Sequence, residues 1–165
     1  MEERIAAAVE EGEALTVVGR MLGTGEPAPD FTLDHTNGPV SLADLAGSTV
    51  VLNVVNSVDT PVCDIQTRRV DDLFPGAEVL TVSMDLPFAL DRWTAAAGVS
   101  HTALSAHRSE HFGTSYGVLI KEWRMLQRAV FVIGPDGRLV HAEYVADQME
   151  EPDYDAAVAA ATAAV

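Results

Sequence analysis

The sequence contains a single cysteine, Cys63, and its position suits redox chemistry. It follows a run of β-branched residues and precedes Ile65, Val70 and Leu73, which have helical spacing, so we expect the sulfur near the start of a helix. The positive end of the helix dipole and the unpaired N–H groups there favour a thiolate, which is a nucleophile. Free cysteine is also a common buried filler, and its position alone leaves that alternative open.

Other residues offer chemistry that must be weighed beside the thiol. Thr60 carries a hydroxyl three residues before Cys63, although an isolated threonine there is also a typical helix cap. His107 and His111 are four residues apart, but no third ligand is placed by the sequence, which favours a solvated surface over a metal site. A thiol hydrolase, with Cys63 paired to a histidine, would need an acyl-transfer motif that is not present. We expect neither a metal nor a cofactor.

Composition limits the partners and the location. The 165 residues suit one domain spanning 1–165. There are 25 acidic and 10 basic residues, so the formal net charge is −15, which disfavours nucleic acid and anionic membrane surfaces. Recruitment of a basic partner is the alternative to a merely solubilising surface. No apolar run approaches the ~20 residues of a membrane span. The opening residues do not resemble a secretory signal, and a cytoplasmic location is expected.

Two hairpins are predicted before the segment that contains Cys63. Ile5–Val9 and Leu15–Val18 flank a short charged turn and can pair as strands, although the first of them would also suit a helix. Residues 31–33 and 40–42 flank Asn37-Gly38, which is a strong turn signal.

The remaining elements follow in an order that indicates the fold. Residues 49–55 are dense in β-branched side chains, as expected of a central strand that is buried on both faces. After the helix that begins near Cys63 we expect a strand at 78–84, a helix at 87–97 ending at Gly98, a short strand at 101–106, a helical turn at 110–116, strands at 128–133 and 139–145 joined by a tight turn, and a helix at 156–165 capped by Asp153. This order predicts a thioredoxin-like α/β fold, with a mixed sheet and helices on both faces.

The chain reads Val58-Asp59-Thr60-Pro61-Val62-Cys63 at the end of the central strand. This segment resembles the active-site loop of the bacterial thiol peroxidases, the atypical two-cysteine branch of the peroxiredoxins. Further segments resemble the same family in the same order: 28–33, 51–53, 83–89, 112–118, 128–132 and 151–157. The resemblance covers nearly the whole chain.

The resemblance implies roles for three residues. Cys63 would attack a hydroperoxide and become a sulfenic acid. Thr60 would place its hydroxyl at the sulfur and the peroxide, and Arg128 would lie across the pocket, lower the pKa of the thiol and polarise the peroxide oxygens. The choice of Arg128 over Arg68, Arg69 or Arg124 rests on the family, because spacing does not distinguish them. The family also implies a homodimer, with the loop beside the active site at its interface.

Two positions depart from the family pattern. Asn56 stands where the loop normally carries a proline, which alters the polarity and stiffness of the loop and therefore the access of peroxide. Thr94 stands in the place of the resolving cysteine, so no internal disulfide can form. The sulfenic acid must then be reduced by an external thiol such as thioredoxin, which is a one-cysteine mechanism.

Both departures also suit a different function, a thioredoxin-fold sensing or binding protein without turnover, whereas a disulfide oxidoreductase would generally need a second cysteine. The peroxidase interpretation requires a sulfur that is ionised and open to a small oxidant.

Overall fold

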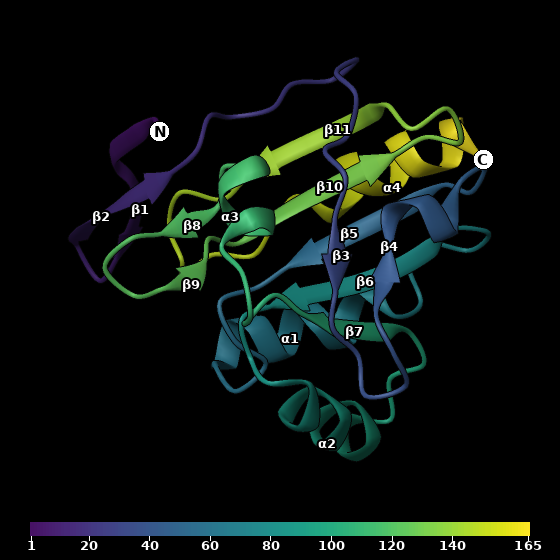
Figure 1. Cartoon of the computed structure of the whole chain (residues 1–165), viewed down its shortest axis with the longest axis horizontal. Coiled ribbons are helices and arrows are strands. Elements are labelled where there is room, and N and C mark those ends of the chain that lie inside the picture. Colours follow the sequence, from purple (N-terminus) through teal and green to yellow (C-terminus); the bar gives the residue numbers. More distant parts are fainter.

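The computed structural model covers all residues, 1–165, and its centre is a five-stranded sheet in the order β11-β10-β5-β6-β7 (Figure 1). These strands are β5 (Val50–Val54), β6 (Glu78–Ser83), β7 (Thr102–Ser105), β10 (Ala129–Ile133) and β11 (Leu139–Tyr144). β5, β6 and β7 are parallel, and β10 is antiparallel to both β5 and β11. The prediction of a central, fully buried strand at this position is confirmed, since β5 lies in the middle and all its residues are buried.

Helices cover both faces of this sheet, which confirms the predicted thioredoxin-like α/β fold. On one face, α1 (Pro61–Val70) and α4 (Tyr154–Ala164) pack against β5 and β10, and α2 (Pro87–Ala97) packs against β7. On the other face, α3 (His111–Ser115) and the 3-10 helix η1 (Leu42–Leu45) contact the largest apolar cluster. None of these helices has the length and apolar character needed to cross a bilayer.

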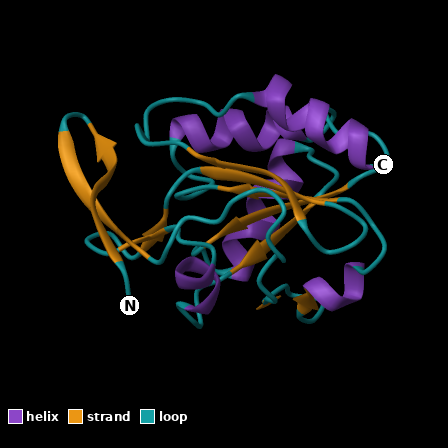
Figure 2. Cartoon of the chain, turned by 90° about the horizontal axis from the view of Figure 1, so that it is seen from above, coloured by secondary structure: helices purple, strands orange, loops and turns teal.

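The two predicted hairpins are both present. β1 (Glu3–Glu10) pairs with β2 (Glu13–Val18), and β3 (Thr32–Leu33) pairs with β4 (Val40–Ser41). Seen from above in Figure 2, the first hairpin extends from one end of the molecule. The sequence did not predict β8 (Leu119–Ile120) and β9 (Met125–Leu126), which join β1 and β2 in a second, four-stranded sheet. Two-residue strands are too short to show an alternating pattern.

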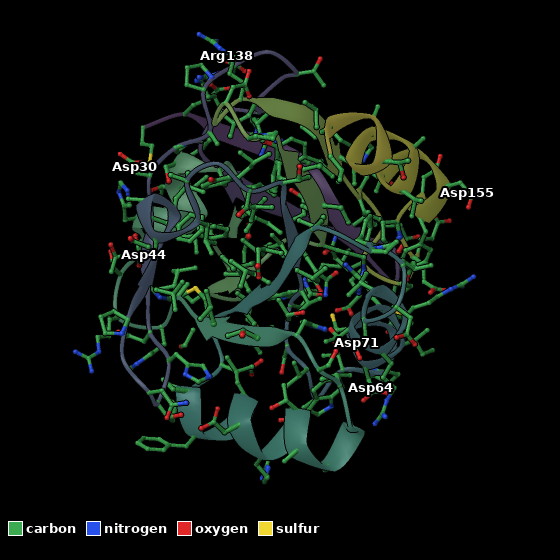
Figure 3. The ribbon with its side chains drawn as sticks, turned by 90° about the vertical axis from the view of Figure 1, so that its right-hand side faces the viewer. Asp30, Asp44, Asp64, Asp71, Arg138 and Asp155 are labelled. Carbon is green, nitrogen blue, oxygen red and sulfur yellow. The ribbon has the colours of Figure 1, made fainter.

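The helix ends follow the expected local chemistry. Gly98 ends α2 in the left-handed region, with φ of 70°, a conformation that glycine adopts without a steric penalty. Asp153 caps α4 through a side-chain oxygen that accepts the backbone N–H of Ala156. Figure 3 shows Asp30 and Asp44 on one side of the molecule and Asp155 on the opposite side, so these charges do not all form one patch.

The inner face of α1 differs from the one that its apolar spacing suggests. Ile65 is half exposed, whereas Gln66 and Thr67 are fully buried. The reason is that the sheet beneath the first turns of α1 is itself polar, because Asn53 on β5 hydrogen-bonds to both Gln66 and Thr67. The helix therefore turns amide and hydroxyl groups inward at the level of Cys63 and apolar groups inward only further along.

Candidate active site

The loop between β5 and α1 is held in place by one carboxylate. Asp85, which follows β6, accepts a hydrogen bond from the hydroxyl of Ser57 at 2.8 Å and another from the backbone N–H of Val58 at 3.0 Å. The hydroxyl of Ser83 donates to the same carboxylate at 2.7 Å. The loop is thereby tied to the end of the neighbouring strand, which fixes where the next helix begins.

Cys63 lies in the first turn of α1, as predicted. Pro61 is the first helical residue, and the first helical hydrogen bond runs from the N–H of Asp64 to the carbonyl of Thr60 at 2.9 Å. The backbone N–H groups before Asp64 have no carbonyl within the helix, so the sulfur lies at the positive end of the helix dipole. This placement favours a negative charge on the sulfur.

The sulfur is less accessible than the chemistry led us to expect. The side chain of Cys63 is fully buried, and its one polar partner is Oδ1 of Asn56, at 3.7 Å from Sγ. The expectation of an open sulfur is therefore wrong for this conformation. Asn56, the polar partner of the sulfur, is buried as well.

Thr60 occupies the helix N-cap position without capping the helix through its side chain. Its hydroxyl donates to the carbonyl of Ser57 at 2.9 Å, so its proton points back into the loop. The oxygen retains lone pairs that can accept a hydrogen bond from a ligand. The side chain is half buried and lines a cavity, which places the hydroxyl at a surface that a small molecule can reach.

Arg128 is a buried cation without a carboxylate partner. The residue is 1% exposed, and Nη1 donates to Oε1 of Gln66 at 2.6 Å while Nη2 donates to the carbonyl of Gln148 at 2.7 Å. Its Nε has no hydrogen-bond partner, and no acidic side chain lies within salt-bridge distance. A buried charge of this kind is costly unless an anion compensates it. The guanidinium is therefore available to stabilise a negative group nearby.

Two side-chain amides link Cys63 to Arg128. Asn56, in contact with the sulfur, donates from Nδ2 to Oε1 of Gln148 at 3.0 Å. The same Oε1 accepts the backbone N–H of Arg128 at 2.9 Å. The structure thus brings Cys63 and Arg128 into one buried hydrogen-bonded cluster, although they are 65 positions apart in the numbering of the chain.

A second line of hydrogen bonds leads away from Gln66, the partner of the guanidinium. Nε2 of Gln66 donates to Oδ1 of Asn53, and Nδ2 of Asn53 donates to Oγ1 of Thr81 at 2.9 Å. Thr81 contacts Nε2 of His101 at 2.7 Å. Each group donates to the next, so the orientation of every amide is determined by its neighbour.

The line ends at Asp71, at the C-terminal end of α1. Nδ1 of His101 lies 2.7 Å from Oδ1 of Asp71, whose carboxylate also accepts the backbone N–H of Ser100. Burial lowers the pKa of His101, and the opposing effect of Asp71 is smaller. The imidazole is therefore neutral at neutral pH, with Nδ1–H donating to Asp71 and Nε2 accepting from the hydroxyl of Thr81. Because the carboxylate of Asp71 can only accept hydrogen bonds, it fixes which group donates and which accepts in every bond of this line.

A cavity of about 260 Å³ opens beside this cluster. Its walls are Glu10, Asn56, Thr60, Trp123 and Met125. Asn56 is shared between the cavity wall and the immediate surroundings of the sulfur. A small molecule in this cavity would have the polar side chains of Asn56 and Thr60 in its walls.

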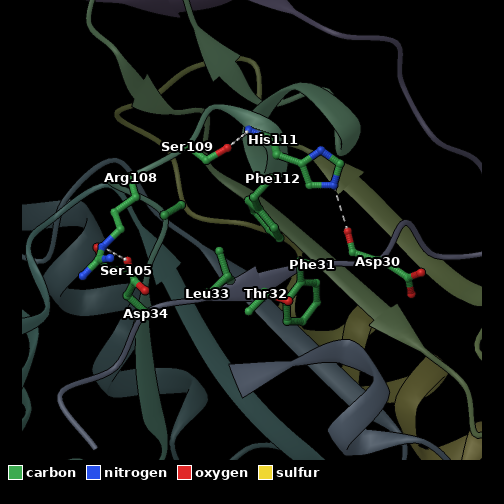
Figure 4. Close-up of a pocket in the computed structure, with 11 residues that line it drawn as sticks. Asp30, Phe31, Thr32, Leu33, Asp34, Ser105, Arg108, Ser109, His111 and Phe112 are labelled. Carbon is green, nitrogen blue, oxygen red and sulfur yellow. Dashed lines mark hydrogen bonds and ion pairs between the residues drawn. The ribbon is translucent and has the colours of Figure 1, made fainter. Parts of the chain in front are cut away.

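A second cavity, of about 350 Å³, lies near α3 and β3 and does not include Cys63 (Figure 4). Its basic groups are engaged: Nε of Arg108 pairs with Asp34 at 2.9 Å, and Nε2 of His111 contacts the carbonyl of Asp30 at 3.2 Å. His107 lies near Asp34 instead, so the two histidines do not converge, and no group of three potential metal ligands is formed.

Comparison with known proteins identifies the family. The AhpC/TSA family matches residues 24–142. The chain belongs to the AhpC/TSA family. Within this family it is 45% identical to a thiol peroxidase of Halalkalibacterium halodurans, over 94% of this chain and 96% of that protein. It is 42% identical to a thiol peroxidase of Bacillus subtilis over the same shares. The resemblance to peroxiredoxins of the thiol peroxidase type is thus confirmed.

Solved structures agree with this AhpC/TSA assignment. A peroxiredoxin-like protein from Aquifex aeolicus superposes with a TM-score of 0.89 at 30% identity, covering 98% of this chain and 99% of that one. A thiol peroxidase from Chromobacterium violaceum superposes with a TM-score of 0.83 at 24% identity, covering 91% and 92% of the two chains. The second likeness supports the fold.

Sequence reasoning missed two residues that hold Arg128, namely Gln66 and Gln148. Gln66 could have been found, because it lies one helical turn after Cys63 and therefore on the same face of α1. Gln148 lies in an irregular segment between β11 and α4, where no periodicity indicates which side chains turn inward. Thr94, in the place of a resolving cysteine, is half buried on α2 and donates to the carbonyl of Asp91 at 3.1 Å.

Proposed function

We propose that this member of the AhpC/TSA family reduces hydrogen peroxide and organic hydroperoxides through Cys63, with Thr60 and Arg128 assisting, and that an external thiol regenerates it. The observation that carries this proposal is the hydrogen-bonded cluster that joins a cysteine in the first turn of a helix to a buried arginine without a carboxylate partner. A thiolate is the anion that would compensate this guanidinium.

The peroxide step is a two-electron transfer to the peroxide. The thiolate of Cys63 attacks one peroxide oxygen, an S–O bond forms, and the O–O bond breaks. The leaving oxygen takes up a proton and departs as water or an alcohol, and Cys63 becomes a sulfenic acid. In this proposal the positive charge of Arg128 stabilises the thiolate and the developing negative charge on the leaving oxygen.

Thr60 acts on the peroxide rather than on the sulfur in this account. Its hydroxyl proton is committed to Ser57, so its oxygen accepts the peroxide O–H and orients the substrate. The peroxide enters through the cavity beside Asn56 and Thr60. Because Cys63 is fully buried, a local motion of the loop between β5 and α1 must expose the sulfur to the peroxide, a motion of the kind common at active-site loops.

Regeneration requires a thiol from outside the chain. Cys63 is the only cysteine and is free, so the sulfenic acid has no partner within the protein. A first external thiol attacks the sulfenic sulfur, water leaves and a mixed disulfide forms, and a second thiol then displaces the Cys63 thiolate. A dithiol protein such as thioredoxin would supply both thiols.

Turnover separates this proposal from a sensor that oxidises once. We expect steady consumption of hydroperoxide when thioredoxin, glutaredoxin or a low-molecular-weight thiol is supplied in excess. Without a reductant, mass spectrometry should show a Cys63 that has gained one oxygen atom and no intramolecular disulfide. A single stoichiometric oxidation followed by no turnover with any of these thiols would contradict the enzymatic proposal and support the sensor.

The proposal includes a homodimer in the cytoplasm, with the loop beside the active site at the interface. The family suggests the dimer, and the exposed apolar side chains of Leu86 and Phe88, next to the Asp85 that anchors this loop, support it. A free thiol suits a reducing compartment. Light scattering should give twice the 17.6 kDa chain mass, and replacement of Phe88 by aspartate should shift it towards the monomer.

A further inference from the structure

Asn56 stands in direct contact with the reacting sulfur at a position where the family normally has a proline. Its amide is buried, and both hydrogens on Nδ2 are used: one bond goes to the carbonyl of Leu126 at 2.6 Å and the other to Oε1 of Gln148 at 3.0 Å. Both partners are acceptors. Rotating the amide by half a turn would place Oδ1 against two oxygens, which fixes the observed orientation.

The orientation of Gln148 is fixed in the same manner. Its Nε2 donates to the carbonyls of Val145 and Ala146 at 2.8 and 3.0 Å, and its Oε1 accepts the backbone N–H of Arg128. Backbone groups cannot exchange donor and acceptor roles, so Gln148 must present an oxygen to Asn56. The orientation of the two amides is therefore fixed by four main-chain groups, which are the carbonyls of Leu126, Val145 and Ala146 and the N–H of Arg128.

The fixed orientation of Asn56 determines which of its atoms faces the sulfur of Cys63. The atom of Asn56 that faces Sγ is Oδ1, at 3.7 Å, and a carbonyl-type oxygen can only accept a hydrogen bond. A protonated thiol can donate to it, whereas a thiolate would face the negative end of the amide dipole. We propose that Asn56 tunes the peroxidatic sulfur by acting as a fixed acceptor that favours its protonated form, against the opposing influence of the helix N-terminus and Arg128.

A proline at this position would offer no acceptor to the sulfur, because it has no polar side-chain atom. Asn56 thus reduces the thiolate fraction at a given pH and slows the attack on peroxide. This last consequence rests on the proposed function, whereas the effect on the proton of Cys63 does not. The advantage for a one-cysteine protein is a resting sulfur that is less readily oxidised while no substrate or reductant is present.

The test measures the thiol pKa of Cys63 from the ultraviolet absorbance of its thiolate in the wild type, Asn56→Leu and Asn56→Ala. Leucine fills similar space without an acceptor and keeps water out, whereas alanine also admits water. We expect the thiol pKa to fall by about half a unit to one unit in both variants, or about 3- to 10-fold more thiolate at low pH. Gln127→Leu is the matched control, because Gln127 is a buried amide that does not contact the sulfur, and it should leave the thiol pKa unchanged.

A thiol pKa that is unchanged or raised in Asn56→Leu would overturn the inference, even if it falls in Asn56→Ala, because water access alone would then explain the alanine result. A second measurement needs no variant. The chain has one thiol, so its infrared spectrum holds one S–H stretching band, which should lie at the lower frequency of a hydrogen-bonded thiol. A band at the frequency of a free thiol would contradict the proposal. If the pKa shifts but no form reduces peroxide, the proposed function fails and this inference stands.

Discussion

The two faces of the central sheet use the same strands for different purposes. On the face that α3 and η1 cover, Leu52, Leu80 and Phe131 belong to a cluster of 18 buried apolar residues. On the face that α1 covers, the next positions along β5 and β6 carry Asn53 and Thr81, and Arg128 lies just before β10, while Val51, Val130 and Val132 form a smaller apolar cluster under α1 and α4. Because side chains alternate between the faces of a strand, one residue step separates hydrocarbon from a hydrogen-bonded polar cluster.

The difference shows where stability and chemistry are placed. The apolar face gains free energy from burial, and the hydroxyl of its buried Tyr116 is satisfied by the carbonyl of Pro29 at 2.8 Å. The polar face must satisfy its buried donors and acceptors, and a line of bonds that runs from Arg128 to Asp71 at the far end of α1 does so for most of them, while Nε of Arg128 is left without a partner. A cluster of this kind adds little net stability but fixes the direction of each side chain, which is what a reactive sulfur requires.

The largest expected effect on activity comes from a substitution on the polar face. Cys63→Ser removes the nucleophile and replaces it with a group of similar size, so peroxide reduction should fall to the uncatalysed rate while the unfolding midpoint changes little. Activity is measured as hydroperoxide consumption with excess thiol, and thermal unfolding is followed by circular dichroism. Thr94→Ser, on α2, is the control and should retain activity. Residual turnover in Cys63→Ser would mean that another group performs the reaction.

A cavity created on the apolar face should lower the stability of the protein without changing the chemistry of Cys63. Phe131→Ala removes a fully buried ring and should lower the free energy of unfolding by about 3–5 kcal/mol. The thiol pKa of the molecules that remain folded should not change. Denaturant titration measures the first quantity, and Val140→Ala, at a partly exposed position on β11, is the control with a small effect. If the thiol pKa moved as much as the stability, the separation between the faces would be wrong.

Arg128→Lys tests whether the donor geometry of the arginine on the polar face matters for the reaction. Lysine keeps the charge but loses the planar arrangement of donors that bonds to both Gln66 and Gln148. We expect kcat/KM for hydrogen peroxide to fall about 100-fold, with a higher thiol pKa. The same change at Arg69, an exposed residue that pairs with Glu151 at 3.6 Å, should leave both values unaltered. Equal kinetics for the two lysine variants would exclude Arg128 from the reaction.

The smallest expected effect concerns pH. Burial lowers the pKa of His101 from its ordinary value of 6.5, so the unfolded chain takes up a proton at a higher pH than the folded chain. The stabilising contribution is complete above about 6.5 and is lost as the pH falls towards the lowered folded pKa. Urea titrations at about pH 7.5 and about pH 5.5 should show a loss of stability that is smaller in His101→Gln, which cannot be protonated. Identical losses in both proteins would contradict this.

The sequence predicted the strand and helix order well, because those elements are long and carry clear periodicity. The β-branched run that becomes β5 and the turn at Asn37-Gly38 are examples. It did not predict β8 and β9, which are two residues long and form through pairing with β2 and with each other. Local pattern cannot reveal an element that exists only through tertiary contacts.

The candidate site was predictable only in part. Cys63 was identifiable as the single thiol at a helix start, and Asn56 stood out by its departure from the family pattern. That the oxygen of Asn56 faces the sulfur follows from Gln148, a residue in an irregular segment 92 positions later. Arg128 was chosen from the family and not from spacing, because its role depends on which strand lies next to β5.

Stopped-flow mixing of the reduced protein with hydrogen peroxide tests most directly whether the polar face activates Cys63. Oxidation is followed by tryptophan fluorescence, since Trp123 lines the cavity beside Asn56 and Thr60. We expect a second-order rate constant at least about 100-fold above that of free cysteine at the same pH, and a loss of that advantage in Arg128→Lys. A rate constant equal to that of free cysteine would show that the sulfur is an unactivated buried thiol.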